Sequence, residues 1–388
     1  MSRKTVGERI AALRTAHGLT GSELGDALGL TKSQISKIEN GTRKLDVSEV
    51  ALVADALGVT LAEVLGVDRK GSLALAARVM SAPTRDETAP ARRRVRQVLE
   101  AEAVLSGAVG LRSASLSTAG TAVVERSREE SLATGPPIAT GARLAEIVRE
   151  ELGLGRAPIA DLPALCERHF GLNVLIWPTG RAVSGLCAHG MDVALMLVSS
   201  SFPRGHQRFT GAHELAHHIL GDPREVIVES DVFAVNTSTE RRSNVFAAAL
   251  LMPADGLSEV VAGRSVDESV ISELLREFAV SYAALLYRLA DRAVRLLTSA
   301  QRDAWLARSP TSVLRIAGRL EPHEPTSPDE SRRVPPRLWS AAQRGYQSGH
   351  VGIGLLSSLV DEDADLLFTR LADAGVRPPT IRDDLADL

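Results

Sequence analysis

Apolar residues recur at helical spacing through the first 66 residues of the chain. In VGERIAALRTA, Val6, Ile10 and Leu13 fall on one helix face, and Gly18 follows as a helix-ending residue. Four further helices are predicted, each starting directly after a residue suited to N-capping: Thr20, Thr31, Asp46 and Thr60. The pattern therefore predicts a compact unit of five short helices.

Between residues 142 and 300 the pattern mixes helical and alternating stretches. Two helices, ARLAEIVREEL and IADLPALCERHFG, precede three short strand-like runs at 172–177, 184–190 and 192–200. A helix over 208–222, a long helical stretch from Glu240 and a helix pair over 278–297 follow. This order predicts a mainly α fold with a small β-sheet, in the α+β class.

The segments outside these two units carry weaker patterns. Residues 67–141 contain two helical stretches and then a part rich in Ser, Thr, Gly and Pro over 111–141, which we interpret as a linker. Residues 301–388 are mostly helical and carry no motif, so we interpret them as a helical cap or dimer element. The predicted domains are 1–66, 67–141, 142–300 and 301–388.

A run of arginines lies in the second of the helical stretches before 111, at Arg92, Arg93, Arg94 and Arg96. The first interpretation is a solvated helix face, and the alternative is an auxiliary contact to phosphate.

Composition narrows the choice of partners. Only 3% of the residues are aromatic while 44% are hydrophobic, so the cores must consist of Ala, Leu and Val. The net charge of −3 indicates no global affinity for nucleic acid, so a DNA-binding surface would have to be local. Cys166 and Cys187 are too few for a disulfide framework or a cysteine zinc site. Without a signal-peptide core or an apolar run of membrane length, we expect a cytoplasmic protein with no membrane partner.

The stretch RFTGAHELAHHILGD contains an HExxH pattern at His213, Glu214 and His217. Residues four apart lie on one face of a helix, so both imidazoles can reach the same metal ion. Glu214 is offset by one residue and can act on a metal-bound water without being a ligand. A catalytic zinc site takes three protein ligands and leaves the fourth position to water, so a third ligand is needed.

Glu240 is the candidate for that ligand. It opens the stretch ERRSNVFAAALLMP, whose apolar residues would face inward, and 22 residues separate it from His217. That length lets the first helix end and the second return to the metal. Asp222 either orients a ligand histidine through its other ring nitrogen or is a loop residue after Gly221. His206, His218 and Tyr282 are candidates for an oxyanion donor, without a spacing argument for any of them.

These two stretches together resemble the ImmA/IrrE metallopeptidase family, over roughly residues 142–300. The resemblance implies a gluzincin-like fold with Zn²⁺ on His213, His217 and Glu240, and with Glu214 as general base. Some members cleave a repressor and so relieve repression. The chain departs from the family pattern at Gly211, where an apolar residue is usual, and at Ser243, where alanine is usual.

The stretch LTGSELGDALGLTKSQISKIENGTRKL resembles the helix-turn-helix of the lambda-repressor and Cro family. Four basic residues against one acidic residue between Thr31 and Lys44 give a local charge of +3. The resemblance implies a recognition helix, with Gln34 as base reader, and a homodimer on a two-fold double-stranded DNA operator. The implied residues facing the major groove are Lys32, Ser33, Gln34, Ser36 and Lys37. Phosphate contacts are implied for Lys37, Asn40, Arg43 and Lys44.

One departure and one alternative concern this module. Gly21 stands where the family often has a DNA-contacting Gln. The alternative function for the module is protein interaction or dimerisation.

Two functions for the whole protein follow. In the first, a DNA-binding regulator carries a zinc endopeptidase that cleaves a repressor or antitoxin-like partner, or itself, with 111–141 as a self-cleavage region. In the second, a transcription factor carries a peptidase-like domain that only senses a metal or ligand. The intact HExxH and Glu240 favour the first.

Overall fold

A computed structural model describes residues 6–16, 19–43, 53, 56–57, 64, 88–189, 193–222, 237–317 and 331–379. The chain divides into two compact units, Met1–Leu73 and Ala74–Leu388. Each unit is described by itself.

Three helices of the first unit are described: α1 (Val6–Ala16), α2 (Gly21–Leu28) and α3 (Lys32–Glu39). Ile10, Leu24 and Ile35 are buried between them, as the helical spacing predicts. A Cβ on Gly7 would lie 2.3 Å from the Ile38 carbonyl oxygen, so glycine allows α1 to cross the end of α3 closely. The two helices predicted after Asp46 and Thr60 lie outside the described residues.

The second unit contains a three-stranded sheet of β1 (Leu172–Trp177), β2 (Gly185–His189) and β3 (Ala194–Ser199). The strand order is β1-β3-β2, with β1 parallel and β2 antiparallel to β3. All three predicted strands are confirmed, and so is the mainly α fold with a small sheet.

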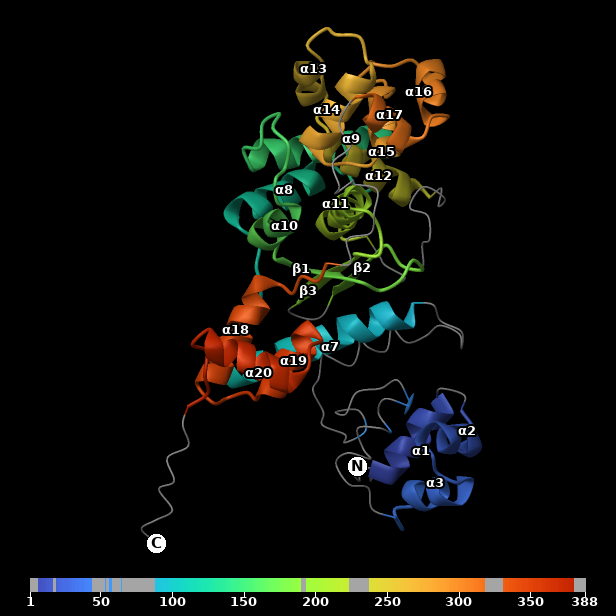
Figure 1. Ribbon diagram of the computed structural model, residues 1–388, viewed down its shortest axis with the longest axis vertical. Helices are drawn as coiled ribbons and strands as arrows, with labels where there is room; N and C mark the ends of the chain where they lie inside the picture. Colours follow the sequence, from blue (N-terminus) through green and yellow to red (C-terminus); the bar gives the residue numbers. More distant parts are fainter. Residues whose placement is uncertain are drawn as a thin grey trace. The chain divides into compact units, whose positions relative to one another are not determined.

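Helices cover both faces of this sheet (Figure 1). Val174 and Val198 face a core shared with α9 (Pro137–Glu151), α10 (Leu162–Phe170), α11 (Arg204–Leu220) and α12 (Ser238–Leu251). Leu175 and Leu197 face the other way, onto α7 (Ala89–Val109). Successive strand residues point to opposite faces, and because both faces are covered the strands are mostly apolar on both.

The remaining helices surround these layers. They are α8 (Thr118–Glu129), α13 (Ala254–Val261), α14 (Glu268–Phe278), α15 (Tyr282–Leu289), α16 (Ser299–Leu306), α17 (Pro310–Ile316), α18 (Pro336–Gln347), α19 (Ile353–Val360) and α20 (Ala364–Asp373). The last three pack with α7 around Leu105, Tyr346 and Leu359.

The helix pair predicted over 278–297 is wrong, because only α15 lies within it. After Leu289 the chain turns back, and the N–H groups of Leu296 and Leu297 both donate to the Leu289 carbonyl oxygen. Arg295 sits at a φ of 54° in this turn, which no helix contains.

Residues 111–141 are not the extended linker that their composition suggests. They contain α8 and the start of α9, and Val123 and Leu132 are buried in the main core. Small and polar residues here serve close packing: a Cβ on Gly120 would lie 1.9 Å from the His169 carbonyl oxygen. The outer boundaries of the predicted domains stay a prediction.

The arginine run is not a solvated face either. Arg93 is exposed, but Arg92 and Arg94 are 8% and 4% exposed. The Arg94 guanidinium lies 3.6 Å from the centre of the Trp177 ring and donates to the carbonyl oxygens of Ser358 and Leu359. The sequence pattern could not show that the C-terminal helices cover this face of α7.

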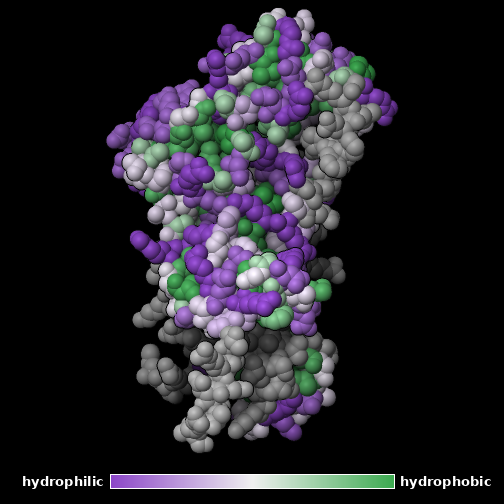
Figure 2. Space-filling view, turned by 60° about the vertical axis from the view of Figure 1, so that its left-hand side comes forward, coloured by the Kyte–Doolittle hydropathy of each residue, from purple (hydrophilic) through white to green (hydrophobic). Residues whose placement is uncertain are grey.

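On the surface, polar and apolar side chains are interspersed over the face that Figure 2 shows. The exposed large apolar residues of the described ranges are spread over several elements: Val104, Leu116, Ile138, Tyr287, Ile316, Leu366 and Phe368. No single described helix is long and apolar enough to cross a membrane, and the bent pair α12 and α13 passes by length and composition alone.

Candidate metal centre

Helix α11 carries the HExxH residues with both histidines toward the interior. Ala212, Leu215 and Ala216 pack into the core, and His213 and His217, one turn apart, are 4% and 7% exposed. Gly211, the departure from the family pattern, fits this packing, because a Cβ there would already lie 3.3 Å from Leu162 Cδ2.

Glu240 lies in the first turn of α12, where the chain returns to the histidines. The Thr237 hydroxyl caps the helix by accepting a hydrogen bond from the Glu240 N–H at 3.2 Å. The Glu240 carboxylate is 3% exposed, with Oε2 2.9 Å from His213 Nε2 and Oε1 3.3 Å from His217 Nε2. The structure therefore brings together the three residues that the sequence predicts as ligands.

These donors suit one zinc ion. The two Nε2 atoms lie 3.1 Å apart, and the ligand atoms of the three residues lie within 4.8 Å of one another. Bonds of about 2.0–2.1 Å in a tetrahedral zinc site separate neighbouring ligand atoms by roughly 3.3 Å. Burial raises the pKa of Glu240, but hydrogen bonds from the two imidazoles outweigh this effect and hold the pKa well below its usual range.

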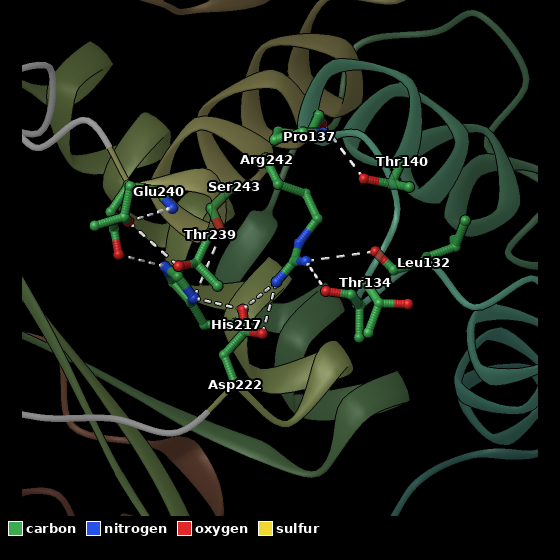
Figure 3. Close-up of polar contacts among 12 residues, drawn as sticks. Leu132, Thr134, Pro137, Thr140, His217, Asp222, Thr239, Glu240, Arg242 and Ser243 are labelled. Atoms are coloured by element: carbon green, nitrogen blue, oxygen red, sulfur yellow. Dashed lines mark hydrogen bonds and ion pairs between the residues drawn. The ribbon is translucent and has the colours of Figure 1, made fainter.

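Each histidine is oriented through its other ring nitrogen. His213 Nδ1 lies 2.8 Å from Asn244 Oδ1, and His217 Nδ1 lies 2.8 Å from Asp222 Oδ2. Both acceptors favour the tautomer with the proton on Nδ1, which leaves Nε2 for a metal. Of the two interpretations left open for Asp222, the structure shows the orienting one (Figure 3).

Glu214 lies between the metal centre and strand β2. A Cβ on Gly185 would lie 3.3 Å from Glu214 Cγ and 3.5 Å from Oε1, so this glycine leaves room for the carboxylate. Burial raises the pKa of Glu214, and the neighbouring histidines only partly oppose this effect. A carboxylate with a raised pKa is a stronger base than one at its ordinary pKa.

The three oxyanion candidates have other contacts in the described structure. The Tyr282 hydroxyl donates to the Trp305 carbonyl oxygen at 2.8 Å, and the His218 Nε2 lies 3.0 Å from the Phe170 carbonyl oxygen. The His206 ring stacks on Phe202, with ring centres 4.5 Å apart. None of these contacts points to a role at the metal.

Two contributors to the site were missed at the sequence level. Asn244 had a usable signal, because it lies four residues after Glu240 and therefore on the same face of α12. Arg242 had no such signal, because no local pattern shows that its side chain meets Asp222, which lies 20 residues away in sequence.

The predicted recognition helix α3 exposes one polar face. Lys32, Ser33, Ser36, Lys37 and Asn40 are exposed, whereas Ile35 and Ile38 are buried against the rest of the unit. The face is therefore available to DNA, and the roles of its residues stay a prediction. Arg43 is half-buried, and Lys44 lies outside the described residues.

Gln34, the expected base reader, has a second role in α3. Its side-chain oxygen accepts hydrogen bonds from the N–H and hydroxyl of Thr31, at 2.8 and 3.0 Å, in a capping box. Reading an adenine edge with both ends of the amide would require this oxygen to leave the cap.

Comparison with known proteins agrees with this geometry. Residues 10–64 match the helix-turn-helix family, and residues 169–290 match the IrrE N-terminal-like domain family. The chain is therefore similar to helix-turn-helix domains in its first unit and to the IrrE N-terminal-like domain in its second. His213, Glu214, His217 and Glu240 all fall within the second match.

One relative is similar to part of this chain. The radiation response metalloprotease IrrE of Deinococcus deserti is 30% identical over 162 residues, which are 40% of this chain and 57% of the relative. The crystal structure of ComR from Streptococcus suis aligns over 96% of this chain and 89% of its own at 12% identity, with a TM-score of 0.16. A TM-score this low does not indicate a shared fold.

Proposed function

We propose that this protein is a DNA-binding regulator whose zinc-dependent endopeptidase domain cleaves a repressor or antitoxin-like protein and so switches gene expression. The observation that carries the proposal is the convergence of His213, His217 and Glu240, with Glu214 beside them. The orientation of both imidazoles by Asn244 and Asp222 supports a centre built for a metal ion. The cytoplasmic location and a homodimer on a two-fold operator remain parts of this proposal.

In the proposed mechanism, the metal ligands and Glu214 have separate roles. Zinc held by His213, His217 and Glu240 supplies Lewis acidity toward water and the peptide carbonyl. Glu214 accepts a proton from the attacking water on its carboxylate and passes it to the leaving amine as the C–N bond breaks. Glu214 thus returns to its ionised state, and its burial increases its strength as a base.

The structure bears on the choice between a partner and the chain itself as substrate. A peptidase requires an extended segment, but residues 118–129 form helix α8 and Val123 is fully buried. Cleavage there would require the main core to open. The proposal therefore favours a separate protein over self-cleavage within 118–129, whereas residues 111–117 form no helix and remain a candidate self-cleavage segment.

Metal content of the full-length protein tests the proposal first. We expect about one zinc per chain in the wild type and in Glu214→Gln, and loss of zinc in His213→Ala and Glu240→Ala. His350→Ala, which removes an exposed histidine outside the cluster, is the matched control and should keep zinc. A wild type without stoichiometric zinc under metal-replete conditions would contradict the proposal.

Turnover is tested separately, on candidate repressor or antitoxin-like proteins co-expressed with the full chain. Cleavage by the wild type and its loss in zinc-loaded Glu214→Gln would establish the endopeptidase. Zinc without cleavage of any such partner would instead support a domain that senses a metal or ligand.

A further inference from the structure

Arg242 occupies a buried position between the metal centre and a loop far away in sequence. It is 3% exposed, and its NH2 donates to Asp222 Oδ1 at 2.6 Å and Oδ2 at 2.8 Å. Its NH1 donates to the carbonyl oxygens of Leu132 and Ala133, in the loop 130–136 between α8 and α9. Figure 3 shows the guanidinium between these two groups of acceptors.

Asp222 needs such a partner, because in the described structure its side chain contacts α11 through the same His217 imidazole that it would have to orient. Helix α11 ends at Leu220 and Gly221 is its left-handed cap, so Asp222 already lies beyond the helix. A carboxylate there can rotate, whereas two hydrogen bonds from one planar guanidinium hold both its oxygens. One of these oxygens, Oδ2, is the atom that lies 2.8 Å from His217 Nδ1.

The loop end of this chain of contacts is itself well held. Leu132 is 4% exposed in the main core, and Glu130 pairs with Arg143 of α9 at 2.8 Å. The two carbonyl groups therefore form a firm anchor for the guanidinium.

We propose that Arg242 is a positioning residue for the metal centre: it fixes Asp222, which fixes His217, and it thereby couples the loop 130–136 to metal affinity. This inference rests on the proposed zinc site. A purely structural role, in which Arg242 only attaches the loop to α12, is the competing explanation.

Zinc affinity of the full-length protein separates the two explanations. It is measured by competition with a chelating dye, and thermal unfolding of the metal-stripped protein is measured beside it. Loss of a residue that orients a ligand weakens zinc binding about 10- to 100-fold. We expect this loss in both Asp222→Asn and Arg242→Met.

The double variant, Asp222→Asn with Arg242→Met, tests whether the two residues act on zinc affinity through the same contact. Because both residues act through His217, the double variant should bind zinc about as weakly as Asp222→Asn alone, not with the product of both losses. Arg242→Lys keeps one charged donor nitrogen but lacks the second, which in Arg242 reaches the loop carbonyl oxygens, so its zinc affinity should fall between those of wild type and Arg242→Met. If Arg242→Met does not fold, the zinc affinity of Arg242→Lys still tests the inference.

Arg149 provides a matched control on α9. It is 7% exposed and donates to the carbonyl oxygens of Gly155, Ala157 and Leu250, none of which belongs to the metal centre. Arg149→Met should lower the unfolding temperature and leave zinc affinity unchanged.

Two results would overturn the inference alone: an Arg242→Met protein that is less stable but binds zinc like wild type, or losses that multiply in the double variant. A wild type that binds no zinc would overturn the proposed function and this inference together.

Discussion

The position of Glu214 beside the two histidines requires a small residue on the neighbouring strand. Helix α11 crosses strand β2 at Gly185, so close that a Cβ there would lie 2.4 Å from Thr210 Cγ2 and 3.3 Å from Glu214 Cγ. The position of Glu214 thus depends on a residue that carries no chemistry of its own.

Gly185→Ala should therefore destabilise the protein by about 1–3 kcal/mol, the usual cost of an extra methyl group in a packed interior. Thr210→Ser removes the methyl group that the new Cβ meets, so the double variant should recover most of the loss. The measurement is urea-induced unfolding. Gly107→Ala, in α7 with nothing within 4 Å of the added Cβ, is the control and should not destabilise. Equal losses in the single and double variants would contradict the close contact.

The ligands of this centre were predictable from the sequence, and their supports were only partly so. The pair His213 and His217 follows from helical spacing, because a helix fixes which residues share a face. Glu240 was a candidate because it opens a second apolar helix, 22 residues further on, that can return to the histidines. Arg242 depends on where the loop 130–136 passes, and no local pattern encodes that path.

Helix α7 packs against both the sheet and the C-terminal helices, and one of its arginines contacts both. Arg94 lies over Trp177 and donates to two carbonyl oxygens at the end of α19. Burial lowers its pKa to about 10, which still leaves the guanidinium charged at neutral pH. A cation at the C-terminus of a helix also complements the helix dipole.

Arg94→Met should cost about 2–4 kcal/mol, because it removes hydrogen bonds from a charged donor and a cation–π contact. Arg93→Met, its exposed neighbour, should change stability by less than about 0.5 kcal/mol. Thermal or urea unfolding of the two variants beside wild type measures the difference. Similar values for both would mean that the arginine run is a solvated face after all.

Predictions of whole elements succeeded where a local pattern sets the structure and failed where packing sets it. The strands 172–177 and 194–199 were predictable because their apolar runs are bounded by turn residues. The linker prediction for 111–141 failed because Ser, Thr and Gly also occur where helices approach closely, as Gly120 does beside His169. Composition alone does not distinguish the two situations.

Taken as a whole, the molecule combines two compact units with different chemistry. The first, Met1–Leu73, exposes Lys32 and Lys37 on α3, and the second, Ala74–Leu388, contains all three proposed metal ligands. The overall division into a helix-turn-helix and a peptidase domain was predictable from two independent motifs, because each motif is local. Whether the two units influence each other is not encoded in either motif.

The endopeptidase proposal makes the two activities separable. Lys37→Ala should weaken binding to a pool of random-sequence DNA duplexes and leave zinc content unchanged. The slope of the logarithm of the binding constant against the logarithm of salt concentration should decrease by about one. Arg93→Met removes the same charge from the second unit and should leave DNA binding as in wild type. Glu240→Ala should lose zinc and still bind the duplex pool. If the zinc-free variant lost DNA affinity as well, the metal would control the DNA-binding unit, and the peptidase-like domain would be acting as a sensor.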